Sequence, residues 1–164
     1  LLFLLEQSNS TIKISNNKSK IKFEMNGSVL ISKVIDGRFP DYSKVVPKGN
    51  DKILQIKLDE FKNSIERVTA VSSDRTKGLR MSISKDVVQL SVSNPSSGEG
   101  VENINAKFNS NDLSISFNSR YLLDIASQIE NDSIIINFND AGSPVLINDF
   151  SDKNSYYVVM PMKI

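Results

Sequence analysis

Alternating apolar and polar residues predict β-strands in the first part of the chain. The alternation runs through residues 11–14 and 20–25, with a polar turn at 16–19 between them. Asn26-Gly27, a strong signal for a tight turn, then leads into a strand at 28–31. The pattern therefore predicts consecutive strands joined by short connections.

A similar order recurs roughly a hundred residues later. After an apolar helix end at Ile129, strands are expected at 133–136 and 145–147, with a turn near Asn139-Asp140 between them. A last strand at 157–159 should stop at Pro161 or run along an edge of the sheet, because proline has no backbone N–H for the ladder. The recurrence suggests that similar units repeat along the chain.

Two segments have helical periodicity instead. The first is expected from about residue 59 to 72, and its apolar face comprises Leu58, Phe61, Ile65, Val68 and Ser72. The second is expected at about 119–128, with Asn118 as its N-cap. Its inward residues are Leu122, Ile125, Ala126 and Ile129. Each helix should pack one side against a sheet.

Composition excludes several kinds of chemistry. The 164 residues are 39% hydrophobic and 24% charged, enough for a modest packed core. The absence of Cys and His rules out disulfides, thiol nucleophiles, Ser-His-Asp triads and the usual zinc sites. A formal net charge of +1 gives no strong overall attraction for nucleic acid, so any DNA contact depends on local arrangement of the 20 basic residues.

Five motifs in register carry a family resemblance. They are YVVMPMKI at 157–164, IDGRFPDY at 35–42, FKNSIERVTAV at 61–71, GLR at 78–80 and FNSRYLLD at 117–124. In these motifs the chain resembles the bacterial replicative sliding clamp, the beta subunit of DNA polymerase III. The resemblance implies an α+β DNA-clamp (processivity-factor) fold, with antiparallel sheets outside and two amphipathic helices lining the inner face.

The resemblance also implies a domain organisation. Family members have three domains of similar size, and 164 residues supply about one and a half. Residues 1–43 are expected to be the second half of the middle domain, 44–51 the linker, and 52–164 the complete C-terminal domain. The opening 1–5 (LLFLL) is too short to span a membrane, lacks signal-peptide features and reads as a helix end.

In function, the resemblance implies a ring that encircles duplex DNA and tethers the replicative polymerase. Such a subunit is non-catalytic, needs no cofactor or metal, and works in the bacterial cytoplasm at the nucleoid. Its inner helices would meet the phosphate backbone without base readout. A solvated charged face is the competing explanation for each single residue. The implied DNA contacts are Lys62, Arg67, Arg75, Lys77, Arg80 and Arg120.

A second implied surface is a groove for the short hydrophobic motifs of the polymerase alpha subunit, the clamp loader and repair polymerases. Carried over residue by residue, it comprises Pro40, Lys44, Val45, Asn118, Tyr121, Pro144, Val158, Val159, Met160, Pro161 and Met162. Lys44 replaces an Arg common in the family, and Lys163-Ile164 replaces Arg-Leu. A TDGHRL-like strand of the opposite wall is absent from this sequence.

A third implied surface closes the ring, in which two full-length protomers meet head to tail. The residues expected there are Ala70, Val71, Glu99 and Glu102. Gly98-Glu99-Gly100 lacks the spacing and the GK[ST] ending of a P-loop, and we expect a loop there.

Two other classes remain open from the residues alone. An enzyme that holds Mg²⁺ between carboxylates needs only Asp and Glu, although most candidates here fall at expected turns and helix starts. Asn/Ser/Thr-rich strands would also suit an extracellular β-rich adhesion module. The two amphipathic helices and the YVVMPM ending count against it.

Overall fold

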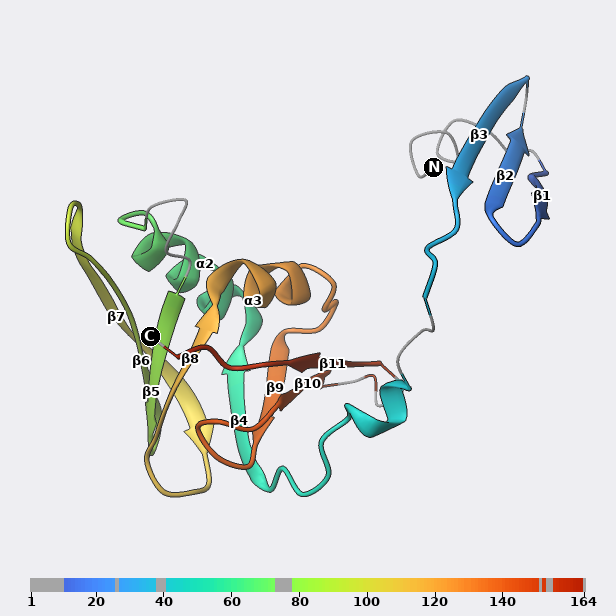
Figure 1. Cartoon of the computed structure of the whole chain (residues 1–164). Coiled ribbons are helices and arrows are strands. Elements are labelled where there is room, and N and C mark those ends of the chain that lie inside the picture. The colour runs from blue at the N-terminus through green and yellow to red at the C-terminus, as the bar shows by residue number, and fades with distance from the viewer. Residues whose placement is uncertain are drawn as a thin grey trace. The chain divides into compact units, whose positions relative to one another are not determined.

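The chain folds into two compact units, Leu1–Pro40 and Asp41–Ile164 (Figure 1). The computed structural model describes residues 11–25, 27–37, 41–72, 78–150, 152 and 155–163. The expected helix end at 1–5 lies outside these residues. The division falls earlier than the expected boundary at 43, and the expected linker 44–51 belongs to the second unit. The reason is local, since Asn50 hydrogen-bonds to the carbonyls of Asn137 and Pro144 in that unit.

The first unit contains a three-stranded antiparallel sheet in the order β1-β2-β3. Its strands are β1 (Lys13–Asn16), β2 (Lys20–Met25) and β3 (Ser28–Lys33). Ile14, Phe23 and Leu30 are cross-strand neighbours on one face. The opposite face carries an ion pair between Lys22 and Glu24 at 2.7 Å. This is the alternation that the sequence predicted, although the first strand begins two residues later than expected.

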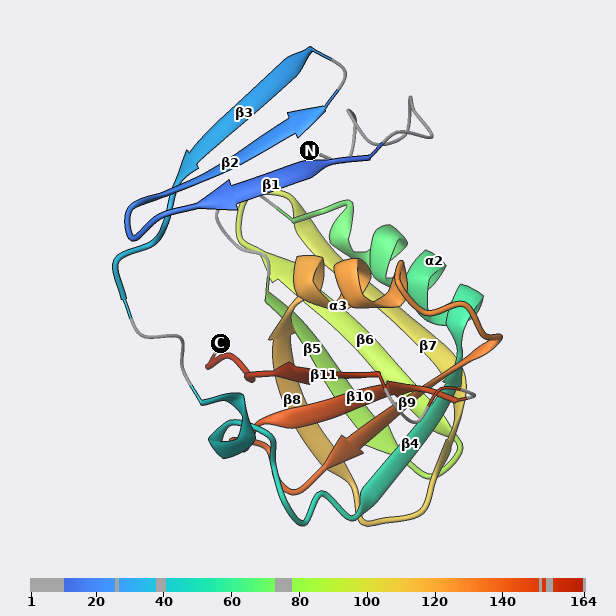
Figure 2. The same ribbon diagram turned by 90° about the vertical axis from the view of Figure 1, so that its right-hand side faces the viewer.

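The second unit contains an eight-stranded sheet in the order β11-β10-β9-β4-β7-β6-β5-β8, and every pairing is antiparallel (Figures 1 and 2). A short 3₁₀ helix, η1 (Tyr42–Lys44), precedes it. The strands are β4 (Lys52–Lys57), β5 (Gly78–Ser84), β6 (Val87–Asn94), β7 (Gly98–Phe108), β8 (Leu113–Asn118), β9 (Ser133–Phe138), β10 (Val145–Asp149) and β11 (Tyr156–Val159).

Two helices, α2 (Leu58–Thr69) and α3 (Ser119–Ala126), lie side by side on one face of this sheet (Figure 2). The predicted inward face of α2 is confirmed for Leu58, Phe61, Ile65 and Val68, which are buried, whereas Ser72 lies beyond the helix end. The predicted N-cap of α3 is also confirmed. The side-chain oxygen of Asn118 accepts a hydrogen bond from the backbone N–H of Arg120 at 3.0 Å.

One hydrophobic core joins the helices to the sheet. Phe61 from α2, Phe117 from β8 and Phe138 from β9 are fully buried within it, together with Leu54 and Ile136 from the centre of the sheet. Burying each such side chain contributes on the order of 1.5–3 kcal/mol. The core therefore fixes both helices on the sheet.

The loop expected at Gly98-Glu99-Gly100 is a wrong prediction, because these residues begin β7. Residues 98–105 of β7 pair with residues 94–87 of β6. The glycine at 100 serves a close contact, since a Cβ atom there would lie 2.5 Å from the carbonyl oxygen of Val68 in α2. Gly100 thus lets the helix backbone approach the strand.

Candidate functional site

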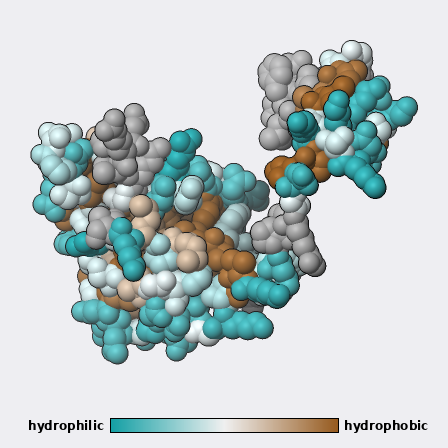
Figure 3. All heavy atoms as spheres, in the orientation of Figure 1, coloured by the Kyte–Doolittle hydropathy of each residue, from teal (hydrophilic) through white to brown (hydrophobic). Residues whose placement is uncertain are grey.

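An apolar hollow of about 460 Å³ lies between α3 and β11. Figure 3 shows hydrophobic surface on the same side of the second unit as β10 and β11 in Figure 1. The hollow contains four residues of the predicted groove, Tyr121, Val158, Val159 and Met160. Three further lining residues, Asp124, Ile125 and Tyr157, were not predicted. The helical spacing of Asp124 and Ile125 from Tyr121 (i+3 and i+4) is a signal that would have found two of them.

Local structure holds the walls of this hollow in place. Among the described residues, β11 is an edge strand that pairs with β10 alone, with Val159 opposite Val145 and Val158 opposite Leu146. The cap at Asn118 fixes the start of α3, which presents Tyr121. Tyr121 is 58% exposed and Met160 59% exposed, so two large side chains with apolar surface remain in solvent. Such a patch is typical of a surface that binds a partner.

A second hollow, of about 590 Å³, lies between η1 with the segment that follows it and the β9–β10 turn. It contains three more residues of the predicted groove, Lys44, Val45 and Pro144. The two hollows adjoin one pair of strands, because Val145, which follows Pro144, is paired with Val159. The structure therefore brings most of the predicted groove residues to two neighbouring hollows at this end of the sheet.

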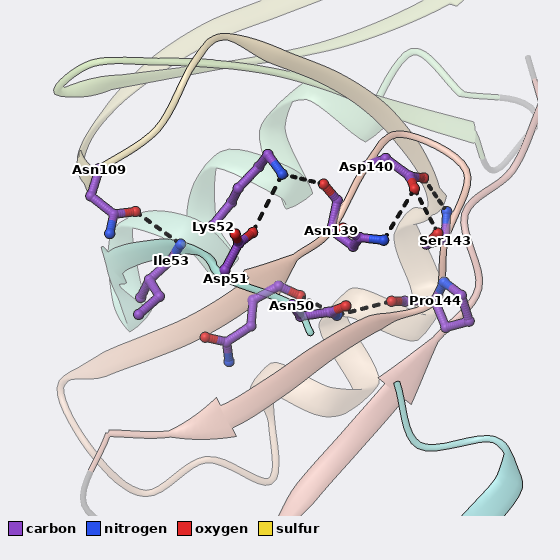
Figure 4. A network of polar contacts seen from close by, with 10 residues as sticks. Asn50, Asp51, Lys52, Ile53, Asn109, Asn139, Asp140, Ser143 and Pro144 are labelled. Carbon is purple, nitrogen blue, oxygen red and sulfur yellow. Dashed lines mark hydrogen bonds and ion pairs between the residues drawn. The ribbon is translucent and has the colours of Figure 1, made fainter. Parts of the chain in front are cut away.

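A polar network shapes the second hollow (Figure 4). Asn50 donates to the carbonyl oxygens of Asn137 at 2.9 Å and Pro144 at 3.0 Å, and Lys52 donates to the carbonyl of Asn139. Asp140 closes the β9–β10 turn by accepting hydrogen bonds from the backbone N–H groups of Gly142 and Ser143 and from the Ser143 hydroxyl. These bonds, first of all the one from Gly142, lower the pKa of Asp140.

The other predicted groove residues have different positions. Asn118 lines neither hollow, because its side chain caps α3. Pro161 and Met162 follow β11, which ends at Val159 as the sequence predicted. The backbone N–H of Met162 donates to the carbonyl of Ser116 in β8 at 2.7 Å, so the tail is attached to the strand at the far end of the sheet order. Pro40 lies outside the described residues.

The predicted DNA contacts separate into distinct environments. Lys62 is half-buried on α2 and Arg120 is exposed on α3. Arg80 lies on the outer face of β5, because its neighbours Leu79 and Met81 are buried in the core on the helix side. Arg75 and Lys77 lie outside the described residues.

Arg67 is already occupied by a partner within the chain. Its guanidinium donates to both carboxylate oxygens of Glu102 on β7, one at 3.0 Å, and to the hydroxyl of Ser64 at 3.0 Å. The arginine holds the pKa of the Glu102 carboxyl below its ordinary value, and the carboxylate raises the pKa of Arg67. Two residues expected on different surfaces, the DNA face and the protomer interface, thus bind each other.

The residues expected at the protomer interface lie around β7 and the end of α2. Over 98–105, β7 pairs with β6 alone within the described part of the chain, whereas residues 106–108 pair with β4. Glu99 is exposed on this stretch, and Ala70 is exposed at the C-cap of α2. Val71 is half-buried and packs against the core. The result is a strand edge with one side open among these residues.

Comparison with known proteins decides the family. Residues 43–163 match the sequence profile described as "DNA polymerase III beta subunit, C-terminal domain". The chain belongs to this beta-subunit family. The predicted α+β clamp fold is confirmed with it, since solved sliding clamps superpose on 99% of the chain.

The similar proteins of the beta-subunit family are sliding clamps. The chain is 34% identical over 161 residues to the Beta sliding clamp of Caulobacter vibrioides (strain NA1000 / CB15N), covering 98% of this chain and 43% of the relative. It is 28% identical over 164 residues to that of Escherichia coli (strain K12), covering 100% and 45%. The chain therefore spans less than half the length of these curated relatives.

Two solved clamps give the same result. The DnaN sliding clamp of Bartonella birtlesii, crystallised with griselimycin bound, has a TM-score of 0.88 and 37% identity over 99% of this chain and 44% of that one. The Caulobacter crescentus clamp has a TM-score of 0.87 and 34% identity over 99% and 43%. Neither the carboxylate–metal enzyme nor the adhesion module is supported by these matches.

The described residues contain no group of three or more acidic side chains placed to hold a metal ion. No helix in this part of the chain is long and apolar enough to cross a membrane.

Proposed function

We propose that this chain is part of a ring-shaped sliding clamp that encircles duplex DNA and tethers the replicative polymerase. The apolar hollow beside β11, in a chain of the beta-subunit family, is the observation that carries the proposal. The role is non-catalytic and needs no cofactor, because it consists of holding other proteins on DNA. The proposed location is the bacterial cytoplasm, at the nucleoid.

The hollow would take a hydrophobic anchor from a short peptide motif, as found in the polymerase alpha subunit, the clamp loader or repair polymerases. An apolar side chain that enters it would bury against Val158 and Met160, with Tyr121 at the side. A well-buried Leu or Phe contributes on the order of 1.5–3 kcal/mol, while association itself costs several kcal/mol. A single buried anchor therefore leaves a small net gain, and we expect affinities of roughly high micromolar to millimolar.

DNA would be held weakly on the helix side. On the two helices, Lys62 and Arg120 are the described candidates without an ion-pair partner among the described carboxylates, and Arg67 would have to share its guanidinium with Glu102. About three phosphate contacts give a log–log salt slope near −2.7 and no sequence preference. Retention on DNA would therefore depend on the closed ring rather than on attraction.

The open side of β7 supports a head-to-tail homodimer in the longer protein. A strand from another protomer would extend the sheet along 98–105, next to Glu99 and the end of α2. This contact is heterologous, so it needs two different faces, and the open side of β7 would be one of them.

Peptide titration by NMR tests the proposal. A synthetic peptide with the hydrophobic end of a polymerase tail should shift amide signals at 121–125 and 157–160. Met160→Ala should weaken binding about fivefold, because it removes an exposed apolar contact. Val101→Ala is the matched control, since Val101 is also an exposed apolar residue, at 51%, but lies on β7. Equal losses in both variants would contradict the assignment.

A further inference from the structure

Arg67 on α2 is held by a carboxylate from another element, that of Glu102 on β7. The alternation of β7 sets this contact, because residues 100, 102 and 104 share the side of the strand that faces α2. A Cβ atom at Gly100 would lie 2.5 Å from the carbonyl oxygen of Val68 in α2, and Ile104 is buried in the core. The strand backbone therefore places the Glu102 side chain between these two contacts, against the helix.

The contact uses the donors that a phosphate would need. Nε of Arg67 donates to Oε2 of Glu102 at 3.0 Å, and Nη2 donates both to Oε1 of Glu102 and to the Ser64 hydroxyl, the latter at 3.0 Å. A guanidinium binds an oxyanion with two N–H groups, either from Nε and Nη2 at its side or from Nη1 and Nη2 at its end. Both arrangements need Nη2, so neither is free while Glu102 is bound.

Ser64 holds the carboxylate from a further direction. Its hydroxyl is buried and donates to Oε1 of Glu102 at 2.9 Å, so the three side chains bond to one another. The Arg67 side chain nevertheless remains 60% exposed, and that of Glu102 is 27% exposed. Arg67 thus reaches solvent with its charge already balanced, whereas Arg120 on α3 is exposed without an ion-pair partner among the described carboxylates.

We propose that Glu102 is an internal counter-ion that keeps Arg67 from binding a DNA phosphate and so sets how tightly the helix face holds duplex. The inference rests on the proposed function, in which α2 and α3 meet the phosphate backbone. A phosphate gains the paired donors of Arg67 only by displacing the carboxylate, since the two anions compete for the same N–H groups. A residue that the family resemblance placed at the protomer interface therefore acts on DNA binding.

The affinity of the whole chain for a short duplex tests this proposal, measured by fluorescence anisotropy at roughly 50 and 200 mM salt. Glu102→Gln removes the charge but keeps the size of the side chain. It should raise the affinity about three- to fivefold at the lower salt concentration and steepen the log–log salt slope by about 0.9, the value for one more phosphate.

Glu66→Gln is the matched control, because it removes the same charge from an exposed residue next to Arg67 on α2. This variant measures the effect of net charge on the helix face without changing the hydrogen bonds between Arg67 and Glu102. It should change duplex affinity less than about twofold and leave the salt slope unchanged.

A double-mutant cycle shows whether the gain acts through Arg67. In the otherwise unchanged chain, Arg67→Gln should lower duplex affinity less than about twofold, while Arg120→Gln should lower it about three- to fivefold. In the Glu102→Gln background, Arg67→Gln should cost as much as Arg120→Gln does and cancel the gain. If Glu102 contributed only to stability or net charge, the effects of the two substitutions would be additive.

NMR separates this inference from the proposed function. Added duplex should shift the backbone amides of α2 and α3 in every variant, and the Nε–H signal of Arg67 in Glu102→Gln but not in the unchanged chain. The absence of shifts on both helices in all variants would overturn the proposed DNA contact, and this inference with it.

With duplex on the helices, three results would overturn the inference alone. One is an equal gain in Glu102→Gln and Glu66→Gln, and another is a gain that persists when Arg67→Gln is added to Glu102→Gln. The third is a loss in Arg67→Gln as large as that in Arg120→Gln when Glu102 is present. This last comparison keeps the test valid should Glu102→Gln disturb the fold.

Discussion

The hollow beside β11 and the helix face of the second unit differ in whether their side chains already have partners within the chain. In the hollow, Tyr121 and Met160 remain more than half exposed. On the helix face, Arg67 is bound to Glu102 and Ser64. Free apolar surface favours a partner that buries it, whereas paired charges attract DNA only weakly. If the proposed function holds, protein partners and DNA would therefore be held by different forces on this unit.

The largest expected effect is the loss of peptide binding after deletion of residues 160–164. The deletion removes Met160 from the hollow and the bond from the Met162 N–H to Ser116, but leaves β11 and the core intact. We expect at least a tenfold loss of affinity for the hydrophobic peptide, measured by NMR titration, with the amide spectrum of the core unchanged. Identical peptide-induced shifts in the truncated chain would remove the tail from the site.

A second effect separates packing of the helix face from its charges. Gly100→Ala would place a Cβ atom 2.5 Å from the carbonyl oxygen of Val68, so we expect a loss of about 1–3 kcal/mol in unfolding free energy. Gly142→Ala is the control, because its nearest neighbouring atom would lie 3.7 Å away. Urea denaturation of both variants measures the difference. Equal midpoints would mean that α2 does not depend on this close approach.

The sequence predicted the parts of the fold that follow from local periodicity. The apolar face of α2, the cap at Asn118 and the end of β11 before Pro161 are decided by residues close in sequence. Gly100 was wrongly predicted to lie in a loop. Its role depends on the Val68 carbonyl, which is distant in sequence. Local patterns reveal helix faces and caps but not which strand a helix approaches.

The candidate site shows the same limit. The groove residues came from the family resemblance, and the structure divides them between two hollows while adding Asp124, Ile125 and Tyr157. Periodicity along α3 could have added the first two. The pairing of Arg67 with Glu102 could not have been read from the sequence, because 35 residues separate them and only the α2–β7 contact brings them together.

A third, smaller effect concerns pH. The pKa of Glu102 is lowered by its bond to Arg67, so the bond stabilises the folded state above the ordinary glutamate pKa of 4.5 and is lost as the pH falls below it. Glu102→Gln should therefore reduce the loss of thermal stability between neutral pH and pH values below 4.5. The variant should still lose some stability at low pH, because the pKa of Asp140 is also lowered in the folded state. If thermal stability fell equally with pH in both proteins, the bond between Arg67 and Glu102 would not form in solution.

The smallest effect concerns Asp124, the carboxylate in the lining of the hollow beside β11. A peptide with Lys next to its hydrophobic anchor should bind about two- to threefold more tightly than one with Gln there, because exposed ion pairs contribute little. Asp124→Asn should abolish this preference. Asp112→Asn, which changes an exposed carboxylate on the loop before β8, is the control. A preference that survives Asp124→Asn would assign it to another residue.

The dependence of both interactions on salt tests the contrast between hollow and helix face most directly. The same chain is titrated with the hydrophobic peptide and, separately, with a short duplex at roughly 50 and 200 mM salt. We predict that peptide affinity changes less than about twofold, because apolar burial dominates it, while duplex affinity falls about 40-fold for about three phosphate contacts. Peptide binding that falls as steeply as duplex binding, or duplex binding that is indifferent to salt, would contradict the account.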